Sequence, residues 1–571
     1  MEKIIKLRKL LINYNLDGYI VPKNDEFFGE YVHKSNDRLK YISNFSGSYG
    51  FALILKTKNF LFVDGRYTLQ AKIQSGKLYD IITIPKKLPV NILKKRKLKI
   101  GYDPKLYTQK TLNNLFKKTK CILIPNRQNL IDLIKNKKIK DNSNKFYVLP
   151  KKVVGKDYKS KIKILFKILN NKKVDFQLVS ACENVAWLLN IRGRDSEFSP
   201  IPNAYLAIDN KKLILFCDPK KIDKKFRNKF RDITLIDIKF VEHFLSKIAN
   251  KNVLIDSSKC SIFFEKLLIK KNRITHNIDP IYDLKSIKTK IEIKNMEKSH
   301  ILDGAALTKF LFWIKKNYIK KKVNEVSAQK KLLQFRKKNK EFKFPSFPTI
   351  SGSGPNGAII HYKATERSKR KLKKGDIYLV DSGGQYNFGT TDVTRTLSLN
   401  NNNVKIKQIF TRVLKGHIAV ANYKLKSGTR GSQIDHAARK SLKQIGLNYP
   451  HGTGHGVGYF LNVHEGPQSF SRNNKTIFKE GMVISNEPGF YLNGKFGIRI
   501  ENLICVKKFK KSHKFIDLTM APIDKSLIVK KILKKNEINW LNNYHSKVFN
   551  NLNKFMNKSE LDELKKACSK I

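Results

Sequence analysis

The sequence predicts an α/β protein of two or three domains. A single hydrophobic core stops growing at roughly 250 to 300 residues, and this chain has 571. Hydrophobic residues make up 41% of it, enough for packed cores rather than disorder. Segments with helical and strand-like periodicity follow one another in the first half, and a glycine-rich region follows in the second. The chain is therefore predicted to be globular and multi-domain.

The first predicted domain spans residues 1–147. It opens with a helix whose apolar residues run from Ile4 to Ile12 and continues through strand-like runs at 51–55 and 60–67. The polar stretch at about 138–152, which contains a proline near its end, is predicted to be a linker.

The second predicted domain spans residues 148–287. A helix, a strand and a further helix lead to the strand pair at 204–218, where Asp209 and Asn210 supply the turn. This order of elements resembles that of the first domain, so the sequence suggests an internal duplication.

The third predicted domain spans residues 288–571. It begins with a long helix at 290–317, contains the glycine-rich region, and carries a C-terminal extension from about residue 508. The tail after about residue 527 is predicted to be helical and amphipathic. Most candidate catalytic residues fall in this domain.

The net charge of +70 is extreme, with 116 Lys and Arg against 46 Asp and Glu. Such a charge by itself favours a nucleic-acid or other anionic partner. Lysine is, however, spread through nearly every segment together with Asn and Ile, and no aromatic-interleaved basic patch stands out. We interpret the charge as compositional drift and expect only salt-dependent, nonspecific binding to polyanions, with no specific nucleic-acid partner.

The sequence predicts a cytoplasmic protein without a membrane partner. The apolar residues at the N-terminus are interrupted by Lys6, Arg8, Lys9 and Asn13, which leaves no signal peptide, and no run approaches the roughly 20 apolar residues of a membrane helix. The cysteines stand singly, so we expect them to be reduced and structural. They are Cys121, Cys182, Cys217, Cys260, Cys505 and Cys568.

Two aspartates lie on a predicted strand hairpin at 375–399. Asp381 ends the first strand and Asp392 begins the second, so the two carboxylates are placed to converge. Their repulsion would be costly without a cation between them, which favours a metal site. The alternative is that both aspartates cap turns beside Gly383 and Gly389.

Three histidines occur within a glycine-rich run at 449–467: His451, His455 and His464. Glycine lets the backbone approach a ligand closely, and a neutral imidazole can coordinate a divalent metal. The run is therefore predicted to be functional rather than structural. His417 and His436 lie in predicted helices beside Lys and Arg and are expected at the surface, without a role.

Two glutamates complete the candidate set. Glu487 precedes a Pro-Gly turn, and Glu501 is placed on an alternating strand with Arg499 on the same face. Each has an ordinary explanation as a turn residue or a salt bridge. Together with the residues above they form an oxygen-rich set with one nitrogen, enough for two divalent ions that share carboxylates. The set is Asp381, Asp392, His455, Glu487 and Glu501.

The order and surroundings of these residues resemble the pita-bread metallopeptidases, the creatinase and methionine-aminopeptidase family M24. The strings LVDSGGQY, TTDVTRT, HGTGHGVG, NVHEGP, EPGFY and GIRIEN are similar to those of the aminopeptidase P branch. DGRYTLQA at 64–71 and FPTISGSGPNGAIIHY at 347–362 extend the resemblance over nearly the whole chain. It implies the long three-domain form, in which two creatinase-N-like α/β domains precede a pita-bread catalytic domain.

The resemblance implies release of the N-terminal residue from peptides with proline second, by attack of hydroxide held between two metals, usually manganese. Asp392 and Glu501 would bridge the metals, and Glu487 would also act as base. The non-ligand histidines would surround the scissile bond and assist proton transfer and oxyanion stabilisation, with the proline ring in an apolar pocket. They are His361, His451 and His464.

Two arginines receive implied substrate-binding roles. Arg499 would orient Glu501 or the groups that bind substrate, and Arg66 would reach the active site of a neighbouring subunit, which implies a homodimer. Two rivals remain open: a prolidase that cleaves Xaa-Pro dipeptides, and a non-catalytic pita-bread protein that binds nucleic acid or protein. The three-domain length and HGTGHGVG favour the aminopeptidase over the first, and the complete ligand set opposes the second.

Overall fold

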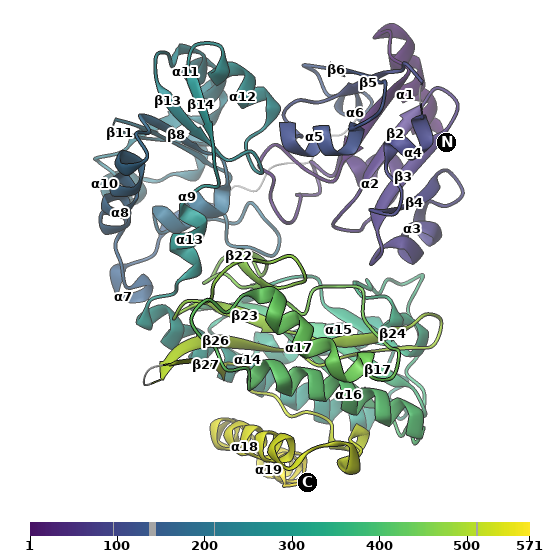
Figure 1. Ribbon diagram of the computed structural model, residues 1–571. Helices are drawn as coiled ribbons and strands as arrows, with labels where there is room; N and C mark the ends of the chain where they lie inside the picture. The colour runs from purple at the N-terminus through teal and green to yellow at the C-terminus, as the bar shows by residue number, and fades with distance from the viewer. Residues whose placement is uncertain (95, 136–143, 211, 510–511) are drawn as a thin grey trace. The chain divides into compact units, whose positions relative to one another are not determined.

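The computed structural model describes residues 1–94, 96–135, 144–210, 212–509 and 512–571. It comprises two compact units (Figure 1). Unit 1 is formed by Met1–Pro150 and Lys156–Tyr282, and unit 2 by Lys151–Gly155 and Asp283–Ile571. The domain boundaries at about 147 and 287 stay predictions.

The first half of unit 1 is built on a six-stranded sheet in the order β4-β3-β2-β1-β5-β6. The predicted N-terminal helix is confirmed as α1, which buries Ile4, Leu7 and Leu11 at helical spacing. The strands are β1 (Gly18–Pro22), β2 (Phe51–Leu55), β3 (Asn59–Asp64), β4 (Asp80–Ile84), β5 (Lys99–Tyr102) and β6 (Ile122–Pro125). The helices are α1 (Glu2–Asn13), α2 (Arg38–Ser43), α3 (Thr68–Ser75), α4 (Pro89–Leu93), α5 (Gln109–Phe116) and α6 (Leu130–Leu133).

The second half of unit 1 repeats this architecture. Its sheet has the order β12-β11-β10-β8-β13-β14, which is the order of the first sheet when the strands are matched in turn. In each sheet the three strands that come first along the chain pair antiparallel with one another, β1-β2-β3 in the first sheet and β8-β10-β11 in the second. All other neighbouring strands pair parallel. This shared topology supports the suggested duplication. The strands are β8 (Phe176–Val179), β10 (Tyr205–Asp209), β11 (Lys212–Cys217), β12 (Thr234–Asp237), β13 (Asn252–Ile255) and β14 (Arg273–His276), with helices α8 (Tyr158–Asn171), α9 (Cys182–Leu188), α10 (Lys224–Lys229), α11 (Val241–Lys247), α12 (Ile262–Ile269) and α13 (Ile281–Ser286).

Only part of the predicted linker at 138–152 can be compared with the structure. Residues 138–143 lie outside the described residues. In the remainder, β7 (Tyr147–Val148) pairs antiparallel with β9 (Ile191–Arg192), and α7 (Lys151–Val154) follows.

Unit 2 packs helices against small antiparallel sheets. The predicted long helix is α14, whose start is fixed by a capping box in which the Thr289 hydroxyl accepts from the Glu292 N–H and the Glu292 carboxylate accepts from the Thr289 N–H. The other helices are α15 (Glu325–Lys337), α16 (Val404–Ala421) and α17 (Gly431–Lys443), after α14 (Lys290–Asn317). The last two, α16 and α17, pack side by side (Figure 1).

The sheets of unit 2 carry the glycine-rich region. One has the order β16-β17-β20, a second β22-β21-β23-β26-β27, a third β15-β18-β19, and β24 pairs with β25. The strands are β15 (Phe342–Pro345), β16 (Ile350–Ser353), β17 (Ile377–Ser382), β18 (Gly384–Tyr386), β19 (Gly389–Thr390), β20 (Val393–Ser398), β21 (Gly454–Gly456), β22 (Glu465–Phe470), β23 (Val483–Asn486), β24 (Gly489–Leu492), β25 (Phe496–Arg499), β26 (Asn502–Phe509) and β27 (Ser512–Asp517).

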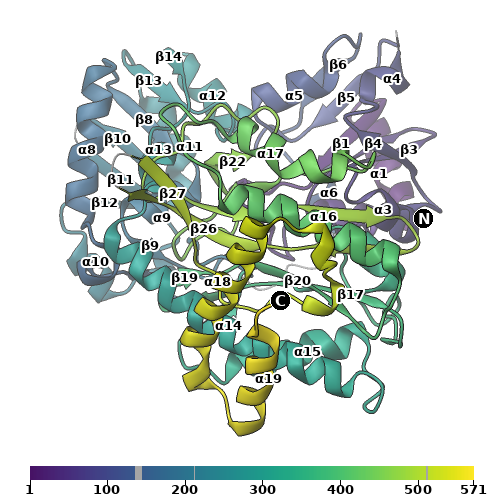
Figure 2. The ribbon, with the colours of Figure 1, turned by 60° about the horizontal axis from the view of Figure 1, so that its bottom comes forward.

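The C-terminal tail forms two helices, α18 (Lys535–Leu552) and α19 (Lys558–Cys568). Helix α18 packs against α14, α16 and α19 (Figure 2). Its buried residues Leu541 and Val548 join one hydrophobic cluster with Phe410 and Leu414 of α16. Since burying a Leu, Val or Phe side chain contributes about 1.5 to 3 kcal/mol, the tail is an integral part of the core of unit 2.

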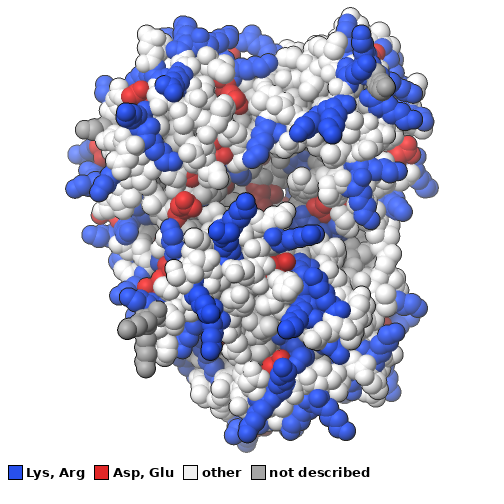
Figure 3. Space-filling model, viewed as in Figure 1, with Lys and Arg blue, Asp and Glu red and all other residues white. Residues whose placement is uncertain are grey.

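The basic residues are spread over the surface as they are along the sequence, and the cysteines stand singly. On the face shown in Figure 3, Lys and Arg are spread over the surface and Asp and Glu are few. All six cysteines lie within the described residues and are unpaired. Among the described residues, every helix is too short or too polar to cross a lipid bilayer.

Candidate metal centre

Strands β17 and β20 bring the two aspartates together. Their antiparallel register places Asp381 opposite Thr394, and Asp392 lies two residues before Thr394, so all three side chains share one face. Both aspartates are buried. The predicted hairpin is more elaborate than expected, because β18 and β19 form a separate short hairpin between its strands, and β18 also pairs with β15.

His455 reaches this site from β21. The chain before it needs a glycine, since a Cβ on Gly454 would lie 1.8 Å from the Ser485 carbonyl oxygen. The Nδ1 of His455 lies 2.9 Å from the Gly456 carbonyl oxygen, so an Nδ1–H can donate there and leave Nε2 as an acceptor. That Nε2 lies 3.6 Å from Asp392 Oδ2 and 3.5 Å from Glu487 Oε1.

The two glutamates come from chain segments that flank strands. Glu487 follows β23, and its Oε1 accepts from the Ser485 hydroxyl at 3.0 Å. Glu501 lies between β25 and β26 rather than within a strand as predicted, and its Oε2 accepts from the Thr394 hydroxyl at 2.7 Å. Because the strand ends converge here, four carboxylates gather at one place.

The carboxylates of this site are poorly neutralised by the protein. Burial, reinforced by the charges of Asp392, Glu487 and Asp381, raises the pKa of Glu501 well above its ordinary value. One carboxylate oxygen, Asp381 Oδ1, is buried without a hydrogen-bond partner. The other Asp381 oxygen accepts from Arg499 Nη2 at 2.6 Å. One guanidinium against four carboxylates leaves an excess of negative charge in a buried place.

The geometry of these side chains fits divalent cations. Ligand atoms of Asp392, His455 and Glu501 lie within 4.8 Å of one another, as groups around one ion would. Oxygen-rich sets with one imidazole suit divalent ions such as manganese. A buried oxygen without a partner and an imidazole whose Nε2 faces the carboxylates are what such ions would satisfy.

A hydrogen-bond network connects Asp381 to His451 through Arg499. Arg499 donates from Nε to the Thr394 hydroxyl at 3.0 Å and from Nη1 to the Tyr491 hydroxyl at 2.6 Å. The same hydroxyl lies 2.9 Å from Nε2 of His451. Burial raises the pKa of Tyr491 to about 12, so its hydroxyl stays protonated at neutral pH.

The other predicted histidines lie around this network in unit 2. His464 is exposed, and its ring centroid is 4.1 Å from that of His455. His361 is half-buried in the loop after the 3-10 helix Gly354–Ala358, which packs against β17, β24 and β25.

Arg66 lies apart from these residues, in unit 1. It follows β3, and its guanidinium pairs with Asp64 (Nη2 to Oδ2, 2.6 Å). Its role toward a neighbouring subunit stays a prediction.

The structure also overturns the prediction for His417. His417, expected at the surface, is fully buried on α16, whereas His436 is exposed as predicted. The error lay in weighing the neighbouring charges, since Val413, Val420 and His417 fall on one face at helical spacing. Thr394 and Tyr491 were also missed as site residues, although the alternation of Asp392 and Thr394 along one strand could have found the first.

Comparisons with known proteins place the chain in a family. A model of metallopeptidase family M24 matches residues 294–508, and one of its C-terminal region matches 511–571. Two models of the creatinase/prolidase N-terminal domain match residues 3–133 and 137–292. A probable Xaa-Pro aminopeptidase P of Laccaria bicolor is 37% identical over all of this chain and 93% of its own. This chain belongs to metallopeptidase family M24.

Two further relatives are similar over nearly the whole chain. Xaa-Pro aminopeptidase 1 of Dictyostelium discoideum is 36% identical over 96% of this chain and 92% of its own. The crystal structure of an X-prolyl aminopeptidase from Caenorhabditis elegans, described as a cytosolic enzyme with a di-nuclear active site, has a TM-score of 0.93 and 30% identity. It covers 100% of this chain and 99% of its own.

A prolidase is similar to a smaller part of the chain. The prolidase of Pyrococcus furiosus has a TM-score of 0.50 and 26% identity, and the match covers 62% of this chain and 98% of its own. The similarity to the X-prolyl aminopeptidase therefore extends over a further third of the sequence.

Proposed function

We propose that this chain is a metal-dependent aminopeptidase that releases the N-terminal residue from peptides with proline at the second position. One observation carries the proposal: the X-prolyl aminopeptidase of Caenorhabditis elegans is similar over the whole of both chains. A prolidase explains only part of the length. The complete set of carboxylates around His455 opposes a non-catalytic relative.

The metal centre would hold two divalent ions, for which we propose manganese. Asp392, His455 and Glu501 would hold ions, since a ligand atom from each lies within 4.8 Å of the others, and the family resemblance implies that the two ions would share Asp392 and Glu501. When bound, such ions polarise the carbonyl of the scissile bond and lower the pKa of water. The proposed ligands are Asp381, Asp392, His455, Glu487 and Glu501.

The remaining residues would move protons and bind substrate. Glu487, one oxygen of which accepts from the Ser485 hydroxyl, would accept the proton of the attacking water. His451, whose Nε2 lies 2.9 Å from the Tyr491 hydroxyl and whose Nδ1 lies 2.7 Å from the Gly452 carbonyl oxygen, would assist proton transfer and oxyanion stabilisation. His464 and His361 would contact the peptide near its proline ring. The peptide bond to proline has no N–H, so the enzyme would recognise the proline ring instead of a backbone hydrogen-bond donor.

Three further points are proposals of the same kind. The chain would form a homodimer, in which Arg66 of one subunit contributes to binding longer peptides at the other. Arg499 would orient Asp381 and, through Thr394, Glu501. The protein would act in the cytoplasm.

The test is release of the N-terminal residue from an Arg-Pro-Pro tripeptide and from an Xaa-Pro dipeptide. We expect cleavage of the tripeptide with added manganese, loss of cleavage with chelator, and little cleavage of the dipeptide. A preference for the dipeptide would identify a prolidase instead. Cleavage of neither peptide by metal-loaded protein would overturn the proposal and favour a binding function.

A further inference from the structure

Helix α18 of the C-terminal tail connects to the metal centre through a buried arginine. Arg395, only 1% exposed, donates from Nη2 to the Tyr544 hydroxyl at 2.8 Å and from Nη1 to the Glu501 carbonyl oxygen at 2.6 Å. Tyr544 lies on α18 and is itself buried. One guanidinium therefore ties α18 to the backbone of a residue in the proposed ligand set.

The Tyr544 hydroxyl is fixed in position by hydrogen bonds to the backbone as well as to Arg395. Its hydroxyl donates to the Ala521 carbonyl oxygen at 2.8 Å, the same oxygen that accepts from Arg395 Nη2 at 2.8 Å. The arginine also donates to the side-chain oxygen of Asn502 at 2.8 Å. Arg395 thus donates to oxygens of neutral groups, and the hydroxyl of Tyr544 is one of these acceptors.

A second connection runs through His417. The Asn486 side chain donates to the His417 carbonyl oxygen at 2.9 Å, and His417 Nδ1 lies 3.1 Å from the Asn486 carbonyl oxygen. Asn486 directly precedes Glu487. The ring of Trp540, also on α18, contacts the His417 ring edge-on at 5.7 Å between centroids.

The two connections begin one helical turn apart. Trp540 and Tyr544 stack on each other at 5.3 Å with an interplanar angle of 4°. Trp540 contacts His417, which bonds to the residue before Glu487. Tyr544 contacts Arg395, which bonds to Glu501 itself. A single aromatic pair on α18 thus contacts the supports of both glutamates.

We propose that Tyr544 and Trp540 are positioning residues of the metal centre, and that α18 sets the spacing of Glu487 and Glu501. This inference rests on the metal binding of the proposed function. Metal sites need ligands held within about 0.5 Å of the productive geometry. Supporting contacts outside the ligands accordingly change metal affinity by about 10- to 100-fold when they are removed.

The test measures metal affinity, because a purely structural helix would affect stability alone. Full-length protein is stripped of metal and titrated calorimetrically with manganese in the absence of peptide. Tyr544→Phe removes only the hydroxyl, and we expect roughly tenfold weaker binding. The activity of this variant should recover as manganese is raised. Val548→Ala, one turn further along α18 and fully buried in the same cluster, is the matched control.

Val548→Ala should lower the melting temperature and leave manganese affinity unchanged. Trp540→Leu keeps an apolar side chain, removes the ring contact with His417, and should also weaken binding, so the inference stays testable if one variant does not fold. Wild-type manganese affinity in both aromatic variants would overturn it. The manganese titration contains no peptide, so it is independent of the cleavage assay. Failure of wild-type protein to cleave either peptide would contradict the proposed function and leave this comparison of manganese affinities valid.

Discussion

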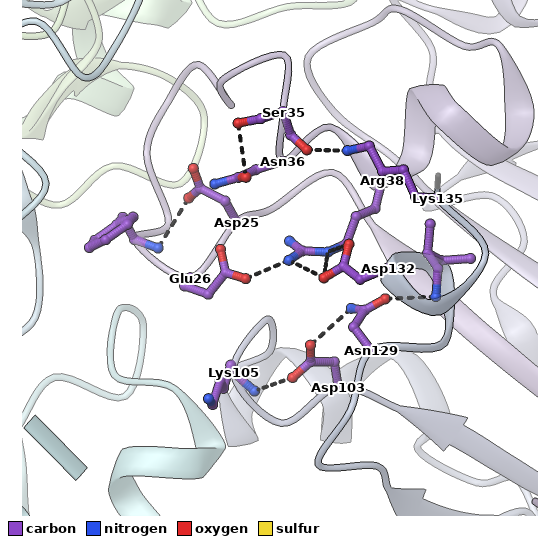
Figure 4. Close-up of polar contacts among 12 residues, drawn as sticks. Asp25, Glu26, Ser35, Asn36, Arg38, Asp103, Lys105, Asn129, Asp132 and Lys135 are labelled. Carbon is purple, nitrogen blue, oxygen red and sulfur yellow. Dashed lines mark hydrogen bonds and ion pairs between the residues drawn. The ribbon is translucent and has the colours of Figure 1, made fainter. Parts of the chain in front are cut away.

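Two regions of the molecule each gather four carboxylates, all buried or half-buried except for one exposed aspartate, and the two regions differ in how the chain neutralises the charges. One is the metal centre of unit 2. The other, which we call the Arg38 cluster, lies in unit 1 (Figure 4). It comprises Asp25, Glu26, Arg38, Asp103 and Asp132.

In the Arg38 cluster each carboxylate accepts from a donor of the chain. Arg38 donates to Glu26 at 2.6 Å and, through two nitrogens, to both oxygens of Asp132 (Figure 4). Asp103 accepts from the Asn129 side chain and from a backbone N–H, and Asp25 accepts from the Phe27 N–H. The acids turn toward these donors rather than toward one another.

In the metal centre the carboxylates and His455 face one another. Asp392, His455 and Glu501 bring ligand atoms within 4.8 Å, and elsewhere in the described ranges no second trio of His, Cys, Asp or Glu does so. An acid count therefore does not distinguish the two regions. The distinction lies in whether the acids and a histidine direct ligand atoms at one common place, where a bound cation can balance their charge.

The largest expected effect separates the regions by activity and metal content. Asp392→Asn should lower tripeptide cleavage by at least about 1,000-fold and abolish tight manganese binding, because a neutral amide replaces the carboxylate of a proposed metal ligand. The metal-free variant should melt at or above the temperature of metal-free wild type, because one of four repelling charges is gone. Activity assays, metal analysis and calorimetry check this.

Asp132→Asn in the Arg38 cluster is the matched substitution. It should leave manganese content and cleavage unchanged. A lower melting temperature for metal-free Asp392→Asn than for metal-free wild type would mean that the chain neutralises this site after all.

The second prediction concerns pH and the cost of burying Asp25. Burial, with the nearby charge of Glu26, raises the pKa of Asp25 to about 6. The folded state then holds a proton that the unfolded chain releases near pH 4, so the stabilisation from Asp25 is full below about pH 4 and is lost as pH rises through 6. The loss approaches about 3 kcal/mol at pH 7, at about 1.4 kcal/mol for a pKa change of one.

Asp25→Asn does not titrate and should gain stability relative to wild type as pH rises from 4 to 7, measured by melting temperature at each pH. Asp17→Asn is the control without this slope. The pKa of Asp17 is lowered, first by the hydrogen bond from Lys56 and then by the Lys99 N–H, so its contribution to stability is present above about pH 4 and is lost only as pH falls below that value. The cost of Asp17→Asn should therefore change little between about pH 4 and pH 7. Parallel profiles for both variants would contradict the burial argument.

The sequence predicted which residues come together at the candidate metal centre better than it predicted the path of the chain through it. Asp381 and Asp392 were recognisable because strand alternation and glycines put both at strand ends. Glu501 was placed on a strand, but Ile500 and Glu501 carry the chain from β25 to β26, which pair in different sheets. Alternation does not reveal where a chain changes sheets, since both segments keep the same periodicity.

Tertiary contacts explain the other gaps. The charged neighbours of His417 conceal a position that faces the core, and the role of Arg395 depends on Tyr544, 149 positions away. No local pattern reports such a contact. The repeated topology of unit 1, in contrast, follows from element order, which the sequence does show.

The prediction with the smallest expected effect compares Arg499 of the metal centre with Arg38 of the Arg38 cluster. Arg499→Lys keeps the charge, but a lysine cannot reach Asp381, Thr394 and Tyr491 at once as the planar guanidinium does. We expect about tenfold weaker manganese binding, or about 1.4 kcal/mol. Arg38→Lys loses the two-nitrogen contact with Asp132 and should lower only the melting temperature. Because both substitutions preserve charge, equal effects on manganese affinity would show that long-range charge, rather than local geometry, controls binding at the metal centre.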